Sequence, residues 1–126
     1  MAKLNPSQSE IEILQSLWDR ERATVREIHN DIQKRRQVGY TTTLKQVQRM
    51  VDKGLIKKVS DASRAHVYRA ILKPQKTRKQ LVDRLVDSAF DGSSNALVLQ
   101  ALGQSKPTAD EIAEIRALLE KYELDD

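Results

Sequence analysis

The residues between Gly39 and Gly54 alternate between apolar and polar positions with the period of an α-helix. At about 100° per residue, one side of this helix collects four apolar side chains, from Leu44, Val47, Met50 and Val51. The opposite side collects hydroxyl, amide and cationic groups, from Thr42, Lys45, Gln46 and Arg49. Groups of these types reach base edges and phosphates in the major groove of DNA. We therefore expect a recognition helix over about residues 42–53, with one face in a core and the other on DNA.

The residues around this helix predict a turn before it and a β-hairpin after it. Gly39 and Tyr40 suit the turn, and Thr41 suits the N-cap position. Gly54 ends the helix, and two β-prone runs follow, at residues 55–59 and 66–71. We expect this hairpin to be a wing that contacts the DNA backbone. The expected backbone contacts are Thr41, Lys57, Lys58 and, at the hairpin tip, Arg64.

Two further helices are predicted before the recognition helix. Asn5 and Pro6 suit the start of the first one, with Gln8 completing a capping box. Its apolar stripe is made by Ile11, Leu14, Leu17 and Trp18, and this spacing makes Trp18 a core anchor rather than a ligand platform. A second capping box, Thr24 to Glu27, opens a helix that runs to about Arg36. Its inward positions are Val25, Ile28 and Ile32. Three helices and a hairpin in this order are the layout of a winged helix-turn-helix.

The pattern changes at Pro74, where we place a domain boundary. Residues 1–74 form the predicted DNA-binding domain, and residues 75–126 form a helical domain. A helix from Lys76 to about Asp91 has a broad apolar face, residues 96–102 are apolar almost all round, and a third capping box at Thr108 opens a last helix. The fold class is thus mainly α with a β-wing: a winged helix-turn-helix followed by an α-helical dimerisation domain.

The apolar residues of the second half predict a homodimer. A helix that is apolar on all sides has to be enclosed, and about fifty residues bury too little surface to enclose it alone. A second copy of the chain, related by a two-fold axis, is the economical solution. The alternative is that these helices pack back on the first half. The expected dimerisation residues are Leu81, Leu85, Phe90, Leu97, Val98, Leu99, Leu102, Ile112, Ile115 and Leu119.

Charge is unevenly distributed between the two halves. Residues 1–74 carry 15 Lys/Arg against 8 Asp/Glu, a net charge of +7, whereas residues 75–126 carry 7 against 10, a net charge of −3. A basic first half suits a polyanion such as double-stranded DNA. Solubility alone would also explain the excess of cations. The polar face of the recognition helix favours nucleic acid.

The sequence offers little for catalysis or cofactor binding. It has no cysteine, which excludes disulfides, thiolate metal sites and thiol nucleophiles. His29 and His66 belong to no metal-binding spacing, and no glycine-rich phosphate loop is present. We expect no enzymatic activity, no metal and no cofactor. Without a long apolar run or a signal peptide, we expect a cytoplasmic protein with no membrane insertion.

Five segments in the same order resemble the penicillinase repressor family, the BlaI/MecI type with CopY-type relatives. Residues 4–14 with Leu17–Asp19 are similar to the family's opening helix, and residues 40–44 with 53–58 to its recognition helix and first wing strand. Residues 64–68 resemble the second wing strand. Residues 96–102 and 110–116 resemble the dimerisation helices.

This resemblance implies a dimeric repressor that occupies a promoter operator and is released by an inducing signal such as cell-wall antibiotic stress. In well-known members, a membrane-bound zinc-protease sensor detects a β-lactam, and the repressor is then cut within its dimerisation segment, typically at Asn-Phe. The corresponding position here is Gln100–Ala101, which departs from that pair. CopY-type relatives carry a cysteine-rich metal-binding tail, and a chain without cysteine cannot sense copper in that way.

Two other functions fit the same residues. A winged helix can serve as a protein-interaction adaptor whose basic face binds an acidic partner. It can also be an architectural DNA binder without sequence preference. Only a specific repressor is expected to protect a pseudo-palindrome with half-sites about one helical turn apart.

Overall fold

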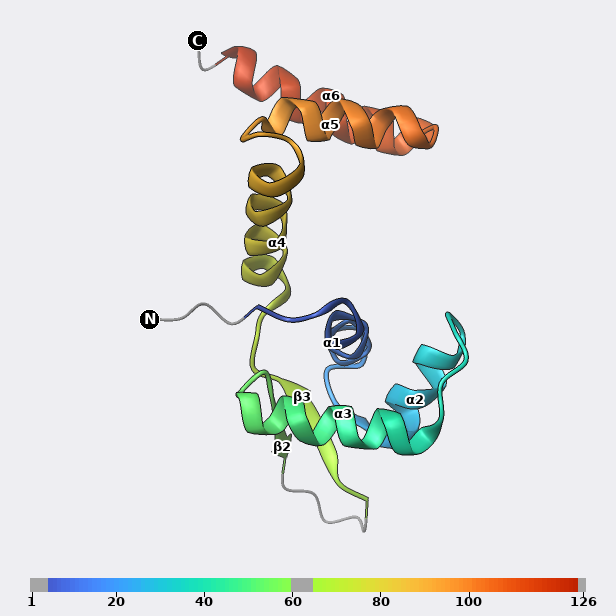
Figure 1. The fold of residues 1–126 in the computed structure, drawn as a ribbon. Coiled ribbons are helices and arrows are strands. Elements are labelled where there is room, and N and C mark those ends of the chain that lie inside the picture. The colour runs from blue at the N-terminus through green and yellow to red at the C-terminus, as the bar shows by residue number, and fades with distance from the viewer. Residues whose placement is uncertain (1–4, 60–64, 125–126) are drawn as a thin grey trace. The chain divides into compact units, whose positions relative to one another are not determined.

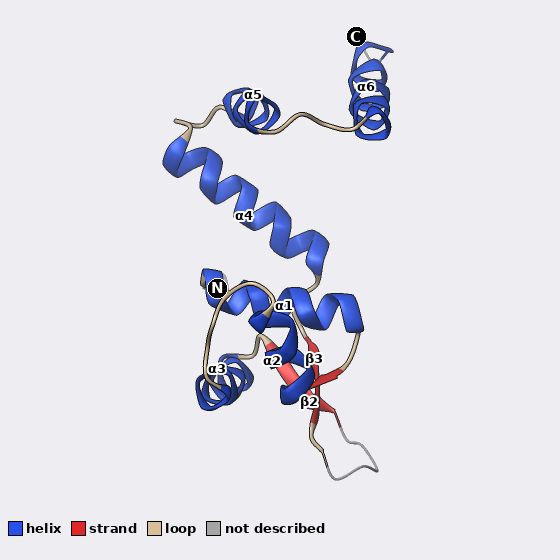
Figure 2. Cartoon of the chain, turned by 90° about the vertical axis from the view of Figure 1, so that its right-hand side faces the viewer, coloured by secondary structure: helices blue, strands red, loops and turns tan. Residues whose placement is uncertain are grey.

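A computed structural model describes residues 5–59 and 65–124 of the chain, so Arg64 and the rest of residues 60–64 lie outside the described residues. The chain divides into two units, Met1–Gln80 and Leu81–Asp126, which we describe separately. The division falls within a helix, six residues after Pro74. Figures 1 and 2 show the helices and strands.

The first unit contains three helices and a small sheet. In chain order these elements are α1 (Gln8–Arg20), β1 (Ala23–Thr24), α2 (Val25–Gln33), α3 (Tyr40–Lys53), β2 (Ile56–Val59) and β3 (Val67–Ala70). The sheet is antiparallel with the order β1-β3-β2, and Lys57 is paired with Arg69 across β2 and β3. The arrangement confirms the expected winged helix. Strand β1, which the sequence pattern did not predict, pairs with β3 through Ala23 and Thr24.

One apolar core joins the three helices to the sheet. Its largest fully buried members are Ile13, Leu14, Leu17, Ile28, Val47, Met50, Leu55 and Ile56. Three of them come from α1, one from α2 and two from α3, while Leu55 directly precedes β2 and Ile56 begins it. The predicted stripe of α1 lacked Ile13, which is fully buried, and contained Ile11, which is only partly buried. Burying each such side chain contributes about 1.5–3 kcal/mol. This shared core holds α3 against α1, α2 and the wing.

Two helix starts differ from the prediction. Helix α1 is capped by Ser7, whose hydroxyl accepts from the Glu10 N–H while the Glu10 carboxylate accepts from the Ser7 N–H, so the expected cap at Asn5 with Gln8 is wrong. Helix α3 begins at Tyr40 with Gly39 at its N-cap, which places Thr41 inside the helix instead of at its cap. The glycine at position 54 ends α3 with a φ of 80°, a left-handed conformation that glycine adopts without steric cost.

The second helix begins as expected and ends earlier. Thr24 caps it, and its hydroxyl and the Glu27 carboxylate complete the reciprocal capping box. The helix ends at Gln33, with Lys34 as C-cap, so Arg36 lies beyond it. Because Arg36 lies outside the helix, it can approach α1, where its Nε donates to the Glu12 carboxylate at 3.0 Å.

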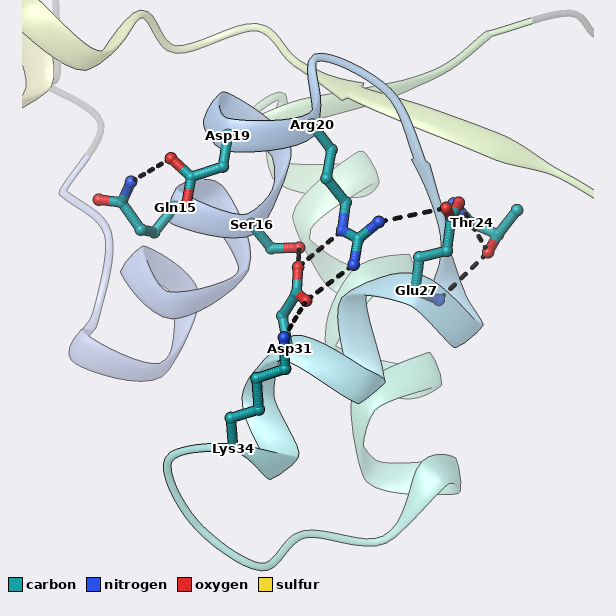
Figure 3. A network of polar contacts seen from close by, with 8 residues as sticks. All are labelled: Gln15, Ser16, Asp19, Arg20, Thr24, Glu27, Asp31 and Lys34. Atoms are coloured by element: carbon teal, nitrogen blue, oxygen red, sulfur yellow. Dashed lines mark hydrogen bonds and ion pairs between the residues drawn. The ribbon is translucent and has the colours of Figure 1, made fainter.

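A polar network on the outside of α1 and α2 fixes their crossing (Figure 3). Asp31 accepts from the Arg20 guanidinium through two bonds of 2.8 and 2.9 Å and from the Ser16 hydroxyl at 2.7 Å. These hydrogen bonds, the Arg20 bonds first, lower the pKa of Asp31 to about 2 although burial acts in the opposite direction. Asp31 is therefore ionised throughout the physiological range.

Trp18 packs on the core, as predicted, and also contacts the segment that follows the wing. It packs partly buried against the core cluster, and its indole Nε1 donates to the Leu72 carbonyl oxygen at 2.8 Å. The Arg78 guanidinium lies 5.6 Å from the ring centroid, a cation–π distance. The segment that leaves β3 is thereby fixed at Leu72, before the next helix begins.

Helix α4 (Pro74–Ala89) runs from the first unit into the second, which also contains α5 (Ser94–Gln104) and α6 (Ala109–Leu124). Thr108 and Glu111 form the expected third capping box, with hydrogen bonds of 2.9 and 3.1 Å. Neither α5 nor α6 contains a buried residue. No helix among the described residues has the length and apolar character that crossing a membrane requires.

Candidate nucleic-acid interface

The two faces of α3 lie as the sequence pattern predicted. Val47 and Met50 are fully buried, and Leu44 and Val51 pack against the same core. The face that this leaves outside carries Thr42, Lys45, Gln46 and Arg49, which line one groove together. Because the apolar side of the helix is fixed in the core, these four polar side chains are held in a constant register.

A buried polar contact fixes the start of α3 on α2. Thr43, which is 1% exposed, lies with its hydroxyl 3.0 Å from Nδ1 of His29, and His29 is 5% exposed. The Tyr40 ring meets the His29 ring edge to face at a centroid distance of 5.4 Å. On the outside, the Arg26 guanidinium lies 4.2 Å from the Tyr40 ring centroid. His29 therefore has a structural role. The sequence pattern did not predict this role, because it places no metal-binding or catalytic residue near His29 and does not show the contact with Thr43.

The groove measures about 850 Å³ and lies between α3 and the amino-terminal part of α1. Besides the four predicted residues of α3, it is lined by Ser7, Gln8, Ser9, Glu12 and Arg36. Its ionic side chains are three cations and one carboxylate. The carboxylate, Glu12, is already paired with Arg36 at 3.0 Å. In the described part of the chain, neither Lys45 nor Arg49 has an acidic partner.

Two hydrogen bonds hold the first turn of α1 against α3. Nε2 of Gln46 donates to the Ser9 hydroxyl at 2.7 Å, and Nζ of Lys53 donates to the buried Glu10 carboxylate at 2.8 Å. Burial alone would raise the pKa of Glu10, but the hydrogen bonds from Lys53 and Ser7 outweigh it and lower that pKa. A bidentate contact with adenine uses both amide atoms, so Gln46 has to release Ser9 before it can read that base.

The expected backbone contacts are more dispersed. Thr41 is exposed on the first turn of α3 but does not line the groove. Lys57 and Lys58 are both exposed on β2, on opposite faces of the sheet because successive side chains of a strand alternate. Lys57 is paired with Arg69 and Lys58 with Tyr68. Arg64 lies outside the described residues, so its expected contact stays a prediction.

The sequence pattern did not single out the α1 side of this groove. Of its residues Ser7, Gln8 and Ser9, only Gln8 was part of the predicted helix start, and no local signal indicates that this start would lie beside α3. A hydrophilic first turn followed by an apolar stripe was the available hint. Arg36 was expected only as the approximate end of the second helix.

The fold is shared with known regulators. A mutant of MarR from E. coli, solved in complex with operator DNA, aligns with a TM-score of 0.55, 19% identity, and coverage of 94% of this chain and 76% of that one. Wild-type apo MarR from E. coli aligns with a TM-score of 0.52, 18% identity and coverage of 94% and 78%. At these identities the similarity concerns the fold.

Proteins with similar sequences identify the family of this chain. Transcriptional regulator BlaI of Mycobacterium tuberculosis is 31% identical over 113 residues, which cover 88% of this chain and 80% of the relative. The methicillin resistance regulatory protein MecI of Mammaliicoccus sciuri is 24% identical over 115 residues, covering 91% and 93%. Residues 6–121 match the family described as penicillinase repressor. The chain therefore belongs to the penicillinase repressor family.

Proposed function

We propose that this DNA-binding transcriptional repressor acts as a homodimer and inserts the outer face of α3 into the major groove of a pseudo-palindromic operator. The observation that carries the proposal is the groove along α3, in which Lys45 and Arg49 have no acidic partner within the described residues. Two exposed cations on one face without neighbouring carboxylates create a local positive potential that attracts a polyanion. The fold and the family both agree with this role.

Each residue of the α3 face has a chemically suited task. Arg49 can donate two parallel hydrogen bonds to guanine O6 and N7. Lys45 is a flexible point charge that suits a phosphate. Thr42, near the amino-terminal end of the helix, can donate its hydroxyl to a phosphate or contact a thymine methyl group. Each phosphate contact contributes close to one unit to the slope of log affinity against log salt concentration.

The outer parts of the interface are assigned to backbone contacts. The proposed phosphate ligands are Thr41 on α3, Lys57 or Lys58 on β2, and Arg64, which the sequence predicts at the hairpin tip. Exposed side chains at Thr41, Lys57 and Lys58 agree with this assignment. Contacts of this kind orient the protein on the duplex without reading sequence.

The dimer is proposed from the apolar surface of the second unit. Leu99 is 63% exposed, Leu119 is 55% exposed, and Val98 is 51% exposed. A protein chain rarely leaves so many large apolar side chains in water, because each one buried contributes about 1.5–3 kcal/mol. A second copy that covers the same helices would bury them and present two α3 helices to half-sites about one helical turn apart.

Release of the operator is proposed to follow an inducing signal such as cell-wall antibiotic stress. The support is the family description and the relative named for methicillin resistance. A membrane-bound sensor protease would act through the dimerisation segment. Gln100 and Ala101, at the position suggested by family resemblance, are both exposed on α5. Cutting there would separate the apolar residues of α5 and weaken the dimer.

The test is a titration of the intact protein with DNA from the promoter of its own operon at several salt concentrations, followed by footprinting. We expect protection of an inverted repeat and an affinity for it at least about a thousandfold above that for unrelated DNA. Equal affinity for every sequence would instead identify an architectural binder. Weak binding without any protected site would favour an adaptor that binds an acidic protein.

A further inference from the structure

A second hollow lies on the first unit, where the wing meets the start of α4. It measures about 500 Å³, within the range of roughly 300–1,000 Å³ that is usual for small-molecule sites. Its apolar surface includes Trp18, Ile71 and Leu72. Ile71 is 46% exposed, which leaves an apolar side chain open to a ligand. None of the residues that line this hollow lines the α3 groove.

The rim of this hollow carries three cations and a single carboxylate. Lys57 and Arg69 stand directly opposite each other across β2 and β3, and Lys73 follows after the end of β3. Two like charges at opposed positions destabilise a sheet. No acidic side chain in the described segments pairs with any of the three cations. An anion placed among them would remove this repulsion.

The carboxylate on the rim belongs to Glu21, which adopts a φ of 66° at the end of α1. Positive φ is uncommon for a residue other than glycine and is unfavourable by itself. Two unfavourable features, the opposed cations and this backbone conformation, therefore meet at one hollow.

We propose that this hollow binds a small organic anion with an apolar, ring-bearing body. The acid group of the ligand lies between Lys57, Arg69 and Lys73. Its ring packs on Ile71 and on the part of the Trp18 ring that remains accessible although Trp18 anchors the core. Charge complementarity selects an anion, since the rim has two positive charges in excess. The apolar surface selects against a bare phosphate or a DNA backbone, because neither offers a group to cover Ile71. Of the two lysines of β2 proposed for the DNA backbone, that contact therefore falls to Lys58, which does not line the hollow.

Trp18 provides a direct test because it is the chain's one tryptophan and its indole N–H gives a single resonance. The intact protein, labelled with ¹⁵N, is titrated with benzoate at constant ionic strength while this resonance is followed. Benzyl alcohol, which has the ring without the charge, and inorganic phosphate, which has the charge without the ring, are titrated in parallel. We expect a saturable shift with benzoate and at most a small, linear one with the other two.

The variants Lys57→Gln and Arg69→Gln should each weaken benzoate binding at least fivefold. Lys106→Gln removes the same charge from an exposed position in the other unit and should leave binding unchanged. An unchanged indole resonance before titration establishes that each variant is folded. The proposal is overturned if benzoate produces no saturable shift, if benzyl alcohol binds equally well, or if phosphate does. None of these readouts involves DNA, so they are independent of the proposed repressor function.

Discussion

Arg49 differs from Arg20 and Arg36 of the same unit in having no carboxylate beside it. Arg20 binds Asp31 and Arg36 binds Glu12, so both guanidinium groups serve the fold. Among the residues that the structure describes, Arg49 has no such partner, and its planar set of donors remains available to a ligand. Together with its place in the α3 groove, this availability is the reason for which we propose Arg49 as a base-reading residue.

Replacing Arg49 with alanine should weaken operator binding by about 1–3 kcal/mol and relax specificity at one base pair, because a bidentate contact with guanine is lost. The measurement is a competition titration with operators mutated at single positions. Gln48→Ala is the matched control, since Gln48 is exposed on the same helix but does not line the groove. If Arg49→Ala leaves operator affinity untouched, the assignment is wrong.

Asp31→Asn should lower the free energy of unfolding at pH 7 by about 1–2 kcal/mol, between the values for an exposed ion pair and a charged hydrogen bond. Because the pKa of Asp31 falls from 3.8 to about 2 on folding, its ionised form stabilises the protein fully above pH 3.8. This contribution is lost as pH falls through about 2. Denaturant titrations should therefore show the two proteins converging between these pH values.

Asp19→Asn is the control for this pH dependence. Asp19 accepts a hydrogen bond from the Gln15 amide at 3.0 Å and has no cation in the network, so its amide variant should cost little at any pH. A gap between wild type and Asp31→Asn that stays constant down to pH 2 would contradict the assigned role of the Arg20–Asp31 pair.

At the scale of the elements, the orientation of α3 depends on one buried polar contact as well as on apolar packing. The Thr43 hydroxyl satisfies Nδ1 of His29, and both side chains are almost completely buried. A buried polar atom that loses its partner keeps the whole desolvation cost. The contact therefore favours one rotation of α3, the rotation that places Thr42 and Arg49 in the groove.

Thr43→Val should reduce the free energy of unfolding by about 1–2 kcal/mol, since the change preserves shape but removes the hydroxyl that satisfies His29. Thr41→Val changes the same side chain at an exposed position of the same helix and should have a smaller effect. Denaturant unfolding of the two variants provides the comparison. Equal effects would show that the His29 contact contributes nothing to the seating of α3.

Element boundaries were predicted well where the signal is local. The capping boxes at Thr24 and Thr108 are present because both partners lie within one turn. The start of α1 was misplaced because Asn5 and Ser7 both suit an N-cap. Only the structure shows that Ser7 and Glu10 form the reciprocal hydrogen bonds of the capping box. Strand β1 was missed because its two residues become a strand only by pairing with β3.

At the scale of the whole molecule, the two units differ in how they use their apolar residues. The first unit buries its own in a core around Leu14, Ile28 and Met50. In the second unit, α5 and α6 bury none, although α5 is built mainly from apolar residues. Such a unit is expected to be stable only when it is covered, so dimerisation and the stability of α5 and α6 should be linked.

Leu99→Asp should raise the dissociation constant of the proposed dimer by roughly a hundredfold or more, because each dimer would bury two unpaired carboxylates. Light scattering or sedimentation equilibrium at micromolar concentration measures this change. Asn95→Asp adds the same charge to α5 without removing an apolar side chain and should leave the dimer intact. A wild-type protein that has the mass of one subunit at this concentration would refute the dimer itself.

The sequence by itself determined which residues of α3 face inward and which face outward, because helical periodicity is a local property of Leu44 to Met50 and their polar neighbours. It also indicated the fold class and the family. Only the tertiary structure decided that Ser9 and Arg36 line the same groove as Arg49, that Thr43 satisfies His29, and that Lys57 shares a hollow with Trp18. These contacts join residues far apart in the chain, and their geometry follows from how the elements pack, which no local pattern specifies.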